Sequence, residues 1–190
     1  MTVREIARRV GVSPSLISQI ERDKVTPSVS TLWGLVTVLG LTMGDLFSGG
    51  AASPGMQPPS PASPASSAPT GGQATIPGAR AIISLETGVQ WERLTASGDS
   101  VVEFLSVIYP PGAASCDEDS LVRHGGKEYG YVISGRLGVR IGFDKYELGP
   151  RMAISFDASS PHRLWAIGDQ PAEAIWVVVG RQNDSRGPLV

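Results

Sequence analysis

The chain has 190 residues, enough for one ordinary domain or two small ones. Its 16 Lys and Arg against 18 Asp and Glu give a net charge of -2, which excludes binding to nucleic acid by bulk positive charge alone. A single cysteine, Cys116, excludes an internal disulfide and a multi-cysteine zinc site. No apolar run reaches the roughly 18 residues that span a bilayer, and the N-terminus lacks a signal-peptide core. We therefore expect a cytoplasmic protein with no membrane partner.

The first 48 residues show apolar side chains at helical spacing. Small polar residues that cap helix N-termini and glycines that end helices alternate along this segment. The predicted helices run from Thr2 to Gly11, from Ser13 to about residue 22, from Ser28 to Gly40, and briefly from Thr42 onward. We predict a small all-α domain over residues 1–48.

Residues 49–78 contain no charged side chain and are rich in Pro, Gly, Ser and Ala. Such a composition buries too little apolar surface to offset the entropy of ordering. We predict a disordered linker over 49–78, which separates a second domain over 79–190.

Residues 79–190 read as short strands separated by Gly, Pro, Asp or Ser. The predicted strands are 81–85, 89–95, 101–109, 128–133, 136–141, 152–156, 162–167 and 173–179. Many short strands at this spacing predict an all-β sandwich or barrel. The fold class is therefore multidomain, with a helical and a β domain.

Two short helices joined by a tight turn at Gly11 have the spacing of a DNA-binding helix-turn-helix. In that motif the start of the second helix meets base edges in the major groove, and basic residues at its end suit phosphates. The candidate DNA-binding residues are Thr2, Ser13, Pro14, Ser15, Ser18, Gln19, Arg22 and Lys24. The stretch IARRVGVSPSLISQIERDKVTPSVSTL resembles the lambda-repressor-like (XRE-type) family, and the resemblance covers residues 2–48.

This resemblance has one departure. Members of the family have a helix before the one that Thr2 caps, so the first helix of the domain is missing here. We expect the face around Trp33 that this helix would cover to be an exposed apolar patch. A native start upstream of Met1, or a truncated copy, would explain the departure.

The only two histidines of the chain, His124 and His162, both fall in the β segment, and Glu128 follows His124 by four residues. With Gly135, this spacing resembles the motifs of the cupin family, a jelly-roll barrel. The resemblance implies that His124, Glu128 and His162 point into the barrel and hold one divalent metal. Two imidazoles and one carboxylate suit Fe(II) and also Zn, Mn or Ni.

The β segment departs from the cupin pattern where Val122 replaces the family's first histidine and Ala166 replaces an asparagine. A metal-free ligand pocket formed by His124, Glu128, Val132 and His162 therefore remains open beside the metal site. Strand alternation places Glu128 and Val132 on one face, and the tyrosines between them on the outer face, where they could meet a second subunit.

Together these features predict a transcriptional regulator that is not an enzyme: a homodimer through its cupin domain that binds a double-stranded DNA operator and a small-molecule effector. A non-haem metal enzyme with a helical N-terminal domain is the alternative, and a cupin that serves only for dimerisation is a third reading.

The helical domain carries five basic and four acidic side chains, so base contacts and dimerisation should outweigh bulk charge in DNA binding. A disordered tether transmits no rotation, so an effector would have to act through dimer geometry or direct domain contact.

Overall fold

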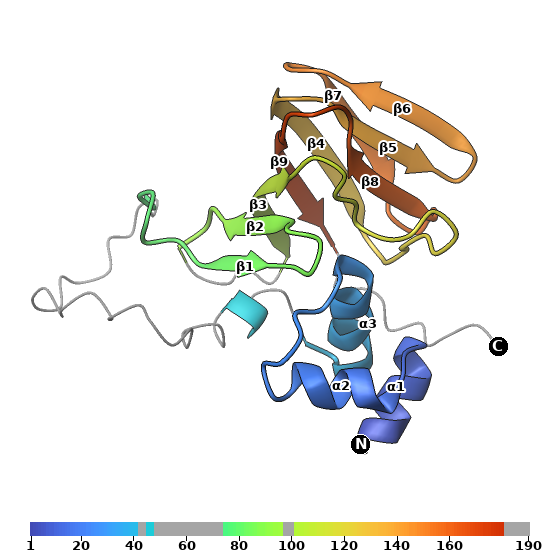
Figure 1. Cartoon of the computed structure of the whole chain (residues 1–190). Helices are drawn as coiled ribbons and strands as arrows, with labels where there is room; N and C mark the ends of the chain where they lie inside the picture. The colour runs from blue at the N-terminus through green and yellow to red at the C-terminus, as the bar shows by residue number, and fades with distance from the viewer. Residues whose placement is uncertain (42–44, 48–73, 97–100, 181–190) are drawn as a thin grey trace, which may run out of the picture.

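A computed structural model describes residues 1–41, 45–47, 74–96 and 101–180 (Figure 1). The helices lie below one end of a β-sandwich, and α3 is the helix nearest to it (Figure 1). The predicted multidomain fold class, an all-α unit followed by an all-β unit, is confirmed. Most of the predicted linker, and the predicted cap Thr42 of a fourth helix, lie outside the described residues; residues 45–47 are helical.

The helices begin at the predicted caps, and α1 and α3 end at the predicted glycines, whereas α2 ends at Ile20, about two residues before its predicted end. The first two helices are α1 (Val3–Val10) and α2 (Pro14–Ile20), and the third is α3 (Val29–Leu39). The side chains of Thr2, Ser13 and Ser28 each accept a hydrogen bond from a backbone N–H in the first turn. Gly11 and Gly40 adopt the left-handed conformation that stops α1 and α3.

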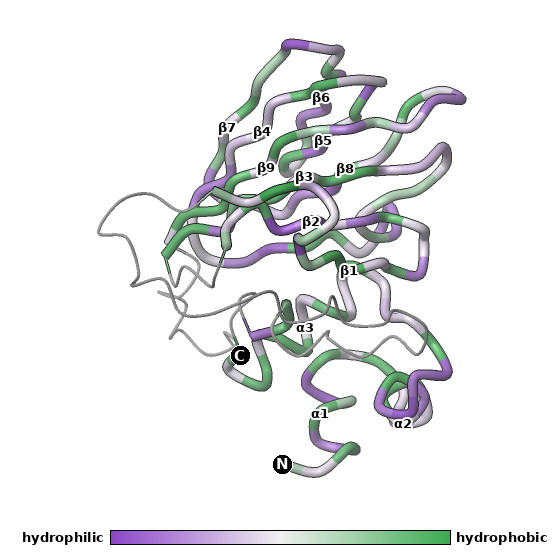
Figure 2. Tube along the Cα trace, turned by 90° about the vertical axis from the view of Figure 1, so that its left-hand side faces the viewer, coloured by the Kyte–Doolittle hydropathy of each residue, from purple (hydrophilic) through white to green (hydrophobic). Residues whose placement is uncertain are grey.

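The β domain consists of two antiparallel sheets. Its strands are β1 (Ile82–Ser84), β2 (Gln90–Arg93), β3 (Val102–Tyr109), β4 (Lys127–Ser134), β5 (Leu137–Ile141), β6 (Asp144–Leu148), β7 (Ala153–Asp157), β8 (His162–Ala166) and β9 (Ala172–Val179). One sheet has the order β1-β2-β3-β9-β4-β7, and the other has the order β6-β5-β8. Hydrophobic residues predominate along β3, whereas α1 and α2 mix hydrophilic and hydrophobic residues (Figure 2).

All eight predicted strands are present, and β6 is an addition to them. Its sequence DKYEL is mostly exposed and forms the edge of the smaller sheet beside β5. The period-2 signal is weak there because an edge strand with both faces near water needs no apolar face. In β4 and β9, by contrast, burial alternates residue by residue.

The expected exposed patch around Trp33 is wrong. Val29, Leu32 and Val36 of α3 are buried and belong to the same apolar cluster as the barrel core. A separate small cluster around Ile6, Ala7 and Ile17 holds the helices together. The β domain therefore covers the face that the sequence predicted to be open. Among the helices of the described residues, none has the length and apolarity needed to cross a bilayer.

We predict that Gly135→Ala destabilises the protein by about 2–4 kcal/mol, because Gly135 has a positive φ of 70° and an added Cβ would overlap the carbonyl oxygen of Pro171. Gly142→Ala is the matched control, since Gly142 also has a positive φ but faces open space. That variant should lose only about 1 kcal/mol. Urea denaturation measures both, and equal losses would show that the Pro171 contact does not matter.

Candidate metal centre

Two strands, and the segment that leads into one of them, bring the cluster residues together. Glu128 lies on the inward face of β4, and His162 is the first residue of β8. His124 lies in the segment before β4, where its N–H donates to the carbonyl of Ala158 at 3.0 Å. Val122 and His162 exchange two backbone hydrogen bonds, which tie this segment to β8. Backbone pairing thus fixes both histidines relative to Glu128.

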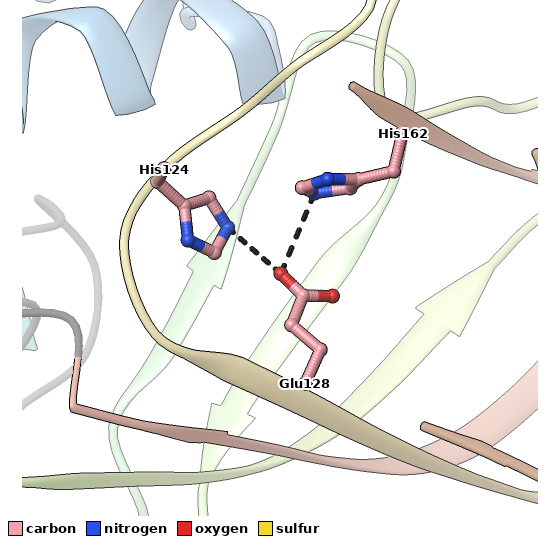
Figure 3. Close-up of side chains that lie close together, drawn as sticks. All are labelled: His124, Glu128 and His162. Atoms are coloured by element: carbon pink, nitrogen blue, oxygen red, sulfur yellow. Dashed lines mark ion pairs between the residues drawn. The ribbon is translucent and has the colours of Figure 1, made fainter. Parts of the chain in front are cut away.

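The two imidazoles converge on one carboxylate oxygen (Figure 3). Nε2 of His124 lies 2.7 Å from Oε1 of Glu128, and Nε2 of His162 lies 3.4 Å from the same oxygen. All three side chains are buried, and their ligand atoms lie within 4.8 Å of one another. The structure therefore brings together the three predicted metal ligands.

The other nitrogen of each ring is already committed. Nδ1 of His124 lies 2.9 Å from the carbonyl oxygen of Gly125, and Nδ1 of His162 lies 2.9 Å from that of Ser160. Because a carbonyl only accepts, both Nδ1 atoms carry hydrogen and donate. Nε2 is then the nitrogen of each ring that faces Glu128: it donates to the carboxylate where it carries a hydrogen, and it is free to bind a metal where it does not.

A buried tryptophan fixes the carboxylate from the other side. Nε1 of Trp176, on β9, donates to Oε2 of Glu128 at 2.7 Å. Trp176 pairs with Gly130 in the register of β4 and β9, and a Cβ at Gly130 would overlap the indole ring. Gly130 thus leaves the room that lets the indole reach the carboxylate two residues away.

The electrostatics of the cluster favour an ionised carboxylate. Burial alone raises the pKa of Glu128, but hydrogen bonds and charge from His124 and His162 outweigh it and hold this pKa well below its usual range. A buried anion between two nitrogen atoms calls for positive charge at that point, either protons on the rings or a cation. Two imidazoles and one carboxylate are a donor set that fits a divalent transition metal.

The cluster forms one wall of a small cavity of about 40 Å³. Apart from the three ligands and the hydroxyls of Ser115 and Tyr109, the lining is apolar or aromatic: Val29, Trp33, Trp91, Leu105, Val107, the ring of Tyr109, Val122, Leu164, Trp176 and Val178. Burial raises the pKa of the Tyr109 phenol, and the charge of Glu128 adds to the rise, so Tyr109 presents a neutral O–H. The site is therefore a small cluster of polar groups at one side of a mostly hydrophobic pocket.

One expectation needs correction here. Val132 is fully buried but is not among the residues that line the cavity; it lies four residues beyond Glu128 along β4 and packs in the barrel core. The pKa of the Cys116 thiol is raised, mainly by burial, and the charge of Asp117 is the smallest of the causes.

The candidate DNA-binding residues lie at the start of α1 and on or next to α2. Ser13, Ser15 and Gln19 are exposed, whereas Ser18 is half-buried. The hydroxyl oxygens of Thr2 and Ser13 serve as helix caps, and Nε of Arg22 donates to the carbonyl of Ser18 at 2.9 Å. Ser15 and Gln19 are thus the exposed polar side chains of the predicted reading helix. The remaining candidates, Pro14 and Lys24, are also exposed.

The pocket residues that sequence reasoning missed include three large aromatic ones: Trp33, Tyr109 and Trp176. The signal for Trp176 was present in the inward alternation of β9 opposite Gly130. Trp33 has no comparable signal, because it comes from the other domain.

Comparisons with known families agree with this architecture. The helix-turn-helix family HTH_3 matches residues 1–46, and the cupin-domain family Cupin_2 matches residues 105–178. The chain thus combines an N-terminal XRE-type helix-turn-helix domain with a C-terminal cupin domain.

Individual proteins are similar to most of the chain or to its C-terminal part. The chain is 26% identical over 163 residues to the HTH-type transcriptional regulator PuuR of Escherichia coli, covering 85% of this chain and 78% of that protein. An HTH_3 family transcriptional regulator from Vibrio cholerae has a similar structure, with a TM-score of 0.61 and 19% identity over 95% of this chain and 87% of that one. An RmlC-like cupin from Shewanella frigidimarina aligns with 60% of this chain and 96% of its own, with a TM-score of 0.50 and 12% identity. The last two establish likeness of fold alone.

We predict that Trp176→Phe lowers the free energy of unfolding by about 1.5–3 kcal/mol, because it removes a hydrogen bond to a buried carboxylate while keeping an aromatic ring. Trp165→Phe is the matched control, since Trp165 lies outside the cavity lining and is only half-buried. Its cost should stay below about 1 kcal/mol. Chemical denaturation compares the two, and a Trp176 variant as stable as the control would refute the anchoring role.

Proposed function

We propose that the chain is a DNA-binding transcriptional regulator whose cupin domain binds a small-molecule effector, a divalent metal, or both. The observation that carries this proposal is the union, in one chain, of a helix-turn-helix domain and a barrel with a buried His-Glu-His cluster. The likeness to a transcriptional regulator over most of the chain supports it. Such a function places the protein in the cytoplasm with its DNA.

On this proposal α2 lies in the major groove. Its exposed Gln19 can pair two ways with adenine, and Ser13, Pro14, Ser15 and Ser18 lie beside it. Arg22 and Lys24 at the end of the helix contact phosphates, and the N-terminus of α1 at Thr2 offers backbone N–H groups to another.

We expect Gln19→Ala to weaken binding to an operator selected from random duplexes by about 1–3 kcal/mol and to relax the preference at one base pair. Lys24→Ala should instead weaken binding to all duplexes alike and lower the salt slope by about one. Fluorescence anisotropy over a salt series separates these patterns, with Arg136→Ala, exposed on the barrel, as control. Unchanged DNA affinity in both helix variants would exclude this reading face.

His124, Glu128 and His162 would hold the metal, with Fe, Zn, Mn and Ni as candidates. Bound there, a divalent ion supplies the positive charge that the buried carboxylate calls for and open positions for a ligand. In the described structure, the Nδ1 bonds to Gly125 and Ser160 and the Trp176 bond to Glu128 already orient the three donors.

We expect protein purified without chelator to hold about one divalent ion per chain, and His162→Ala or Glu128→Gln to lower metal affinity by at least about tenfold. Glu118→Gln is the control, because Glu118 is a largely exposed carboxylate that ion-pairs with Arg163. Elemental analysis by mass spectrometry gives the stoichiometry. A metal content equal in all four proteins, or near zero in the parent, would count against a metal at this cluster.

The metal-enzyme alternative depends on the same three side chains, but the helix-turn-helix domain favours regulation.

We also propose a homodimer through the cupin domain. Its support is the outer face of β4, where Tyr129 and Tyr131 are exposed and line an apolar groove of about 390 Å³ with residues of β7 and β9. A dimer would present two reading helices to two half-sites.

A further inference from the structure

The other domain contributes part of the lining of the cavity beside the His-Glu-His cluster. Trp33 and Val29, both on α3, line it together with residues of the barrel. The indole of Trp33 lies 5.3 Å from the His124 ring and 5.3 Å from the Trp91 ring, measured between centroids, with tilts of 35° and 42°. In Figure 3 a pale blue helical ribbon lies on the His124 side of the cluster.

Several contacts hold α3 in this position. Val29, Leu32 and Val36 share a buried cluster with the barrel core. Just before α3, the carbonyl of Pro27 accepts a hydrogen bond from the N–H of Glu86, at the turn between β1 and β2, at 3.1 Å. After α3, the guanidinium of Arg93 on β2 lies 5.4 Å from the ring centroid of Phe47. The docking is thus apolar at its centre, with polar contacts at both ends.

The enclosed space is too small for most metabolites. A volume of about 40 Å³ accommodates at most about three water-sized probes. A metal ion and one or two waters fit, but an organic molecule of more than a few non-hydrogen atoms does not. The largest side chain that the helical domain contributes to the lining is Trp33.

We propose that a small organic effector binds this pocket by taking the place of the Trp33 indole, and thereby releases α3 from the barrel. The lining defines its chemical class: a polar, metal-coordinating group directed at the cluster, joined to a flat apolar body that packs against Trp91. This inference rests on the proposed effector function and names how that site is regulated.

Release of α3 changes the position of the DNA reader. α1 packs on both α2 and α3, so the reading helix moves with α3 as one unit. While α3 is docked, the helix-turn-helix of α1 and α2 has a fixed position relative to the barrel. After release of α3, its position is no longer fixed. The coupling is reciprocal, since whatever holds α3 on the barrel weakens binding of a bulky effector.

The test uses the full chain loaded with Zn²⁺ and two probes with the same coordinating group, formohydroxamate and benzohydroxamate. Amide hydrogen exchange of Glu86, followed by NMR, reports docking, because its N–H bonds across the domains. Benzohydroxamate should speed this exchange at least about tenfold, whereas Zn²⁺ alone and formohydroxamate should leave it unchanged. Binding of benzohydroxamate with Glu86 still protected would overturn the inference.

Trp33→Ala supplies a second, independent arm. Without any ligand it should speed the exchange of Glu86, and it should tighten benzohydroxamate binding by about tenfold or more, because no indole has to be displaced. Formohydroxamate affinity should not change, and Trp165→Ala, outside the cavity lining, should change neither quantity. Equal benzohydroxamate affinity in the parent and Trp33→Ala would contradict the proposal.

Failure of the proposed function gives a different pattern. If Zn²⁺ does not bind, the metal part of that function fails. Amide exchange of Glu86 in metal-free Trp33→Ala still tests whether Trp33 holds α3 on the barrel. No increase there would overturn the inference on its own, and an increase would support it.

Discussion

An ionised carboxylate removed from water needs positive charge or hydrogen-bond donors around it. The groups that surround the buried carboxylate of Glu128 therefore have to supply them. Its two oxygens face three aromatic rings: the imidazoles of His124 and His162 at Oε1 and the indole of Trp176 at Oε2. Each imidazole is in turn fixed by a backbone carbonyl at Nδ1. The orientation of the donors is therefore built into the strands and loops and does not depend on a bound ion.

The fold meets this requirement through strand register. β4 and β9 lie side by side, and their pairing brings Trp176 over Gly130, two residues from Glu128. The Val122–His162 bridge brings the His124 segment to β8. Val29 and Trp33 of α3 line another side of the pocket, so a helix of the helix-turn-helix domain contributes to the burial of the cluster. The contact between α3 and the barrel thus also contributes to the burial of the Glu128 charge.

Local chemistry allowed much of this to be predicted from the sequence. Helix caps such as Thr2, Ser13 and Ser28 act within a few residues, so the helix bounds followed from them. Alternation in β4 placed Glu128 inward, and the rarity of histidine singled out His124 and His162. β6 was missed because it is an exposed edge strand without an apolar face.

What could not be predicted depends on contacts between distant segments. The barrel covers α3 through contacts between residues about 55 to 90 positions apart, such as those of Trp33 with Trp91 and His124. No local sequence pattern encodes such contacts. The same contact turns an expected exposed patch into an interface. Val132 was assigned to the pocket by strand alternation, which gives the face of a residue but not its depth along the strand.

The central claim is that His124, Glu128 and His162 form a metal centre, and X-ray absorption spectroscopy of the zinc-loaded full chain tests it most directly. We predict two imidazole nitrogens at about 2.0–2.1 Å and carboxylate or water oxygens at about 2.0–2.2 Å around the metal. A sulfur scatterer at about 2.3 Å, which only Cys116 or a methionine could supply, or the absence of imidazole multiple scattering would contradict it.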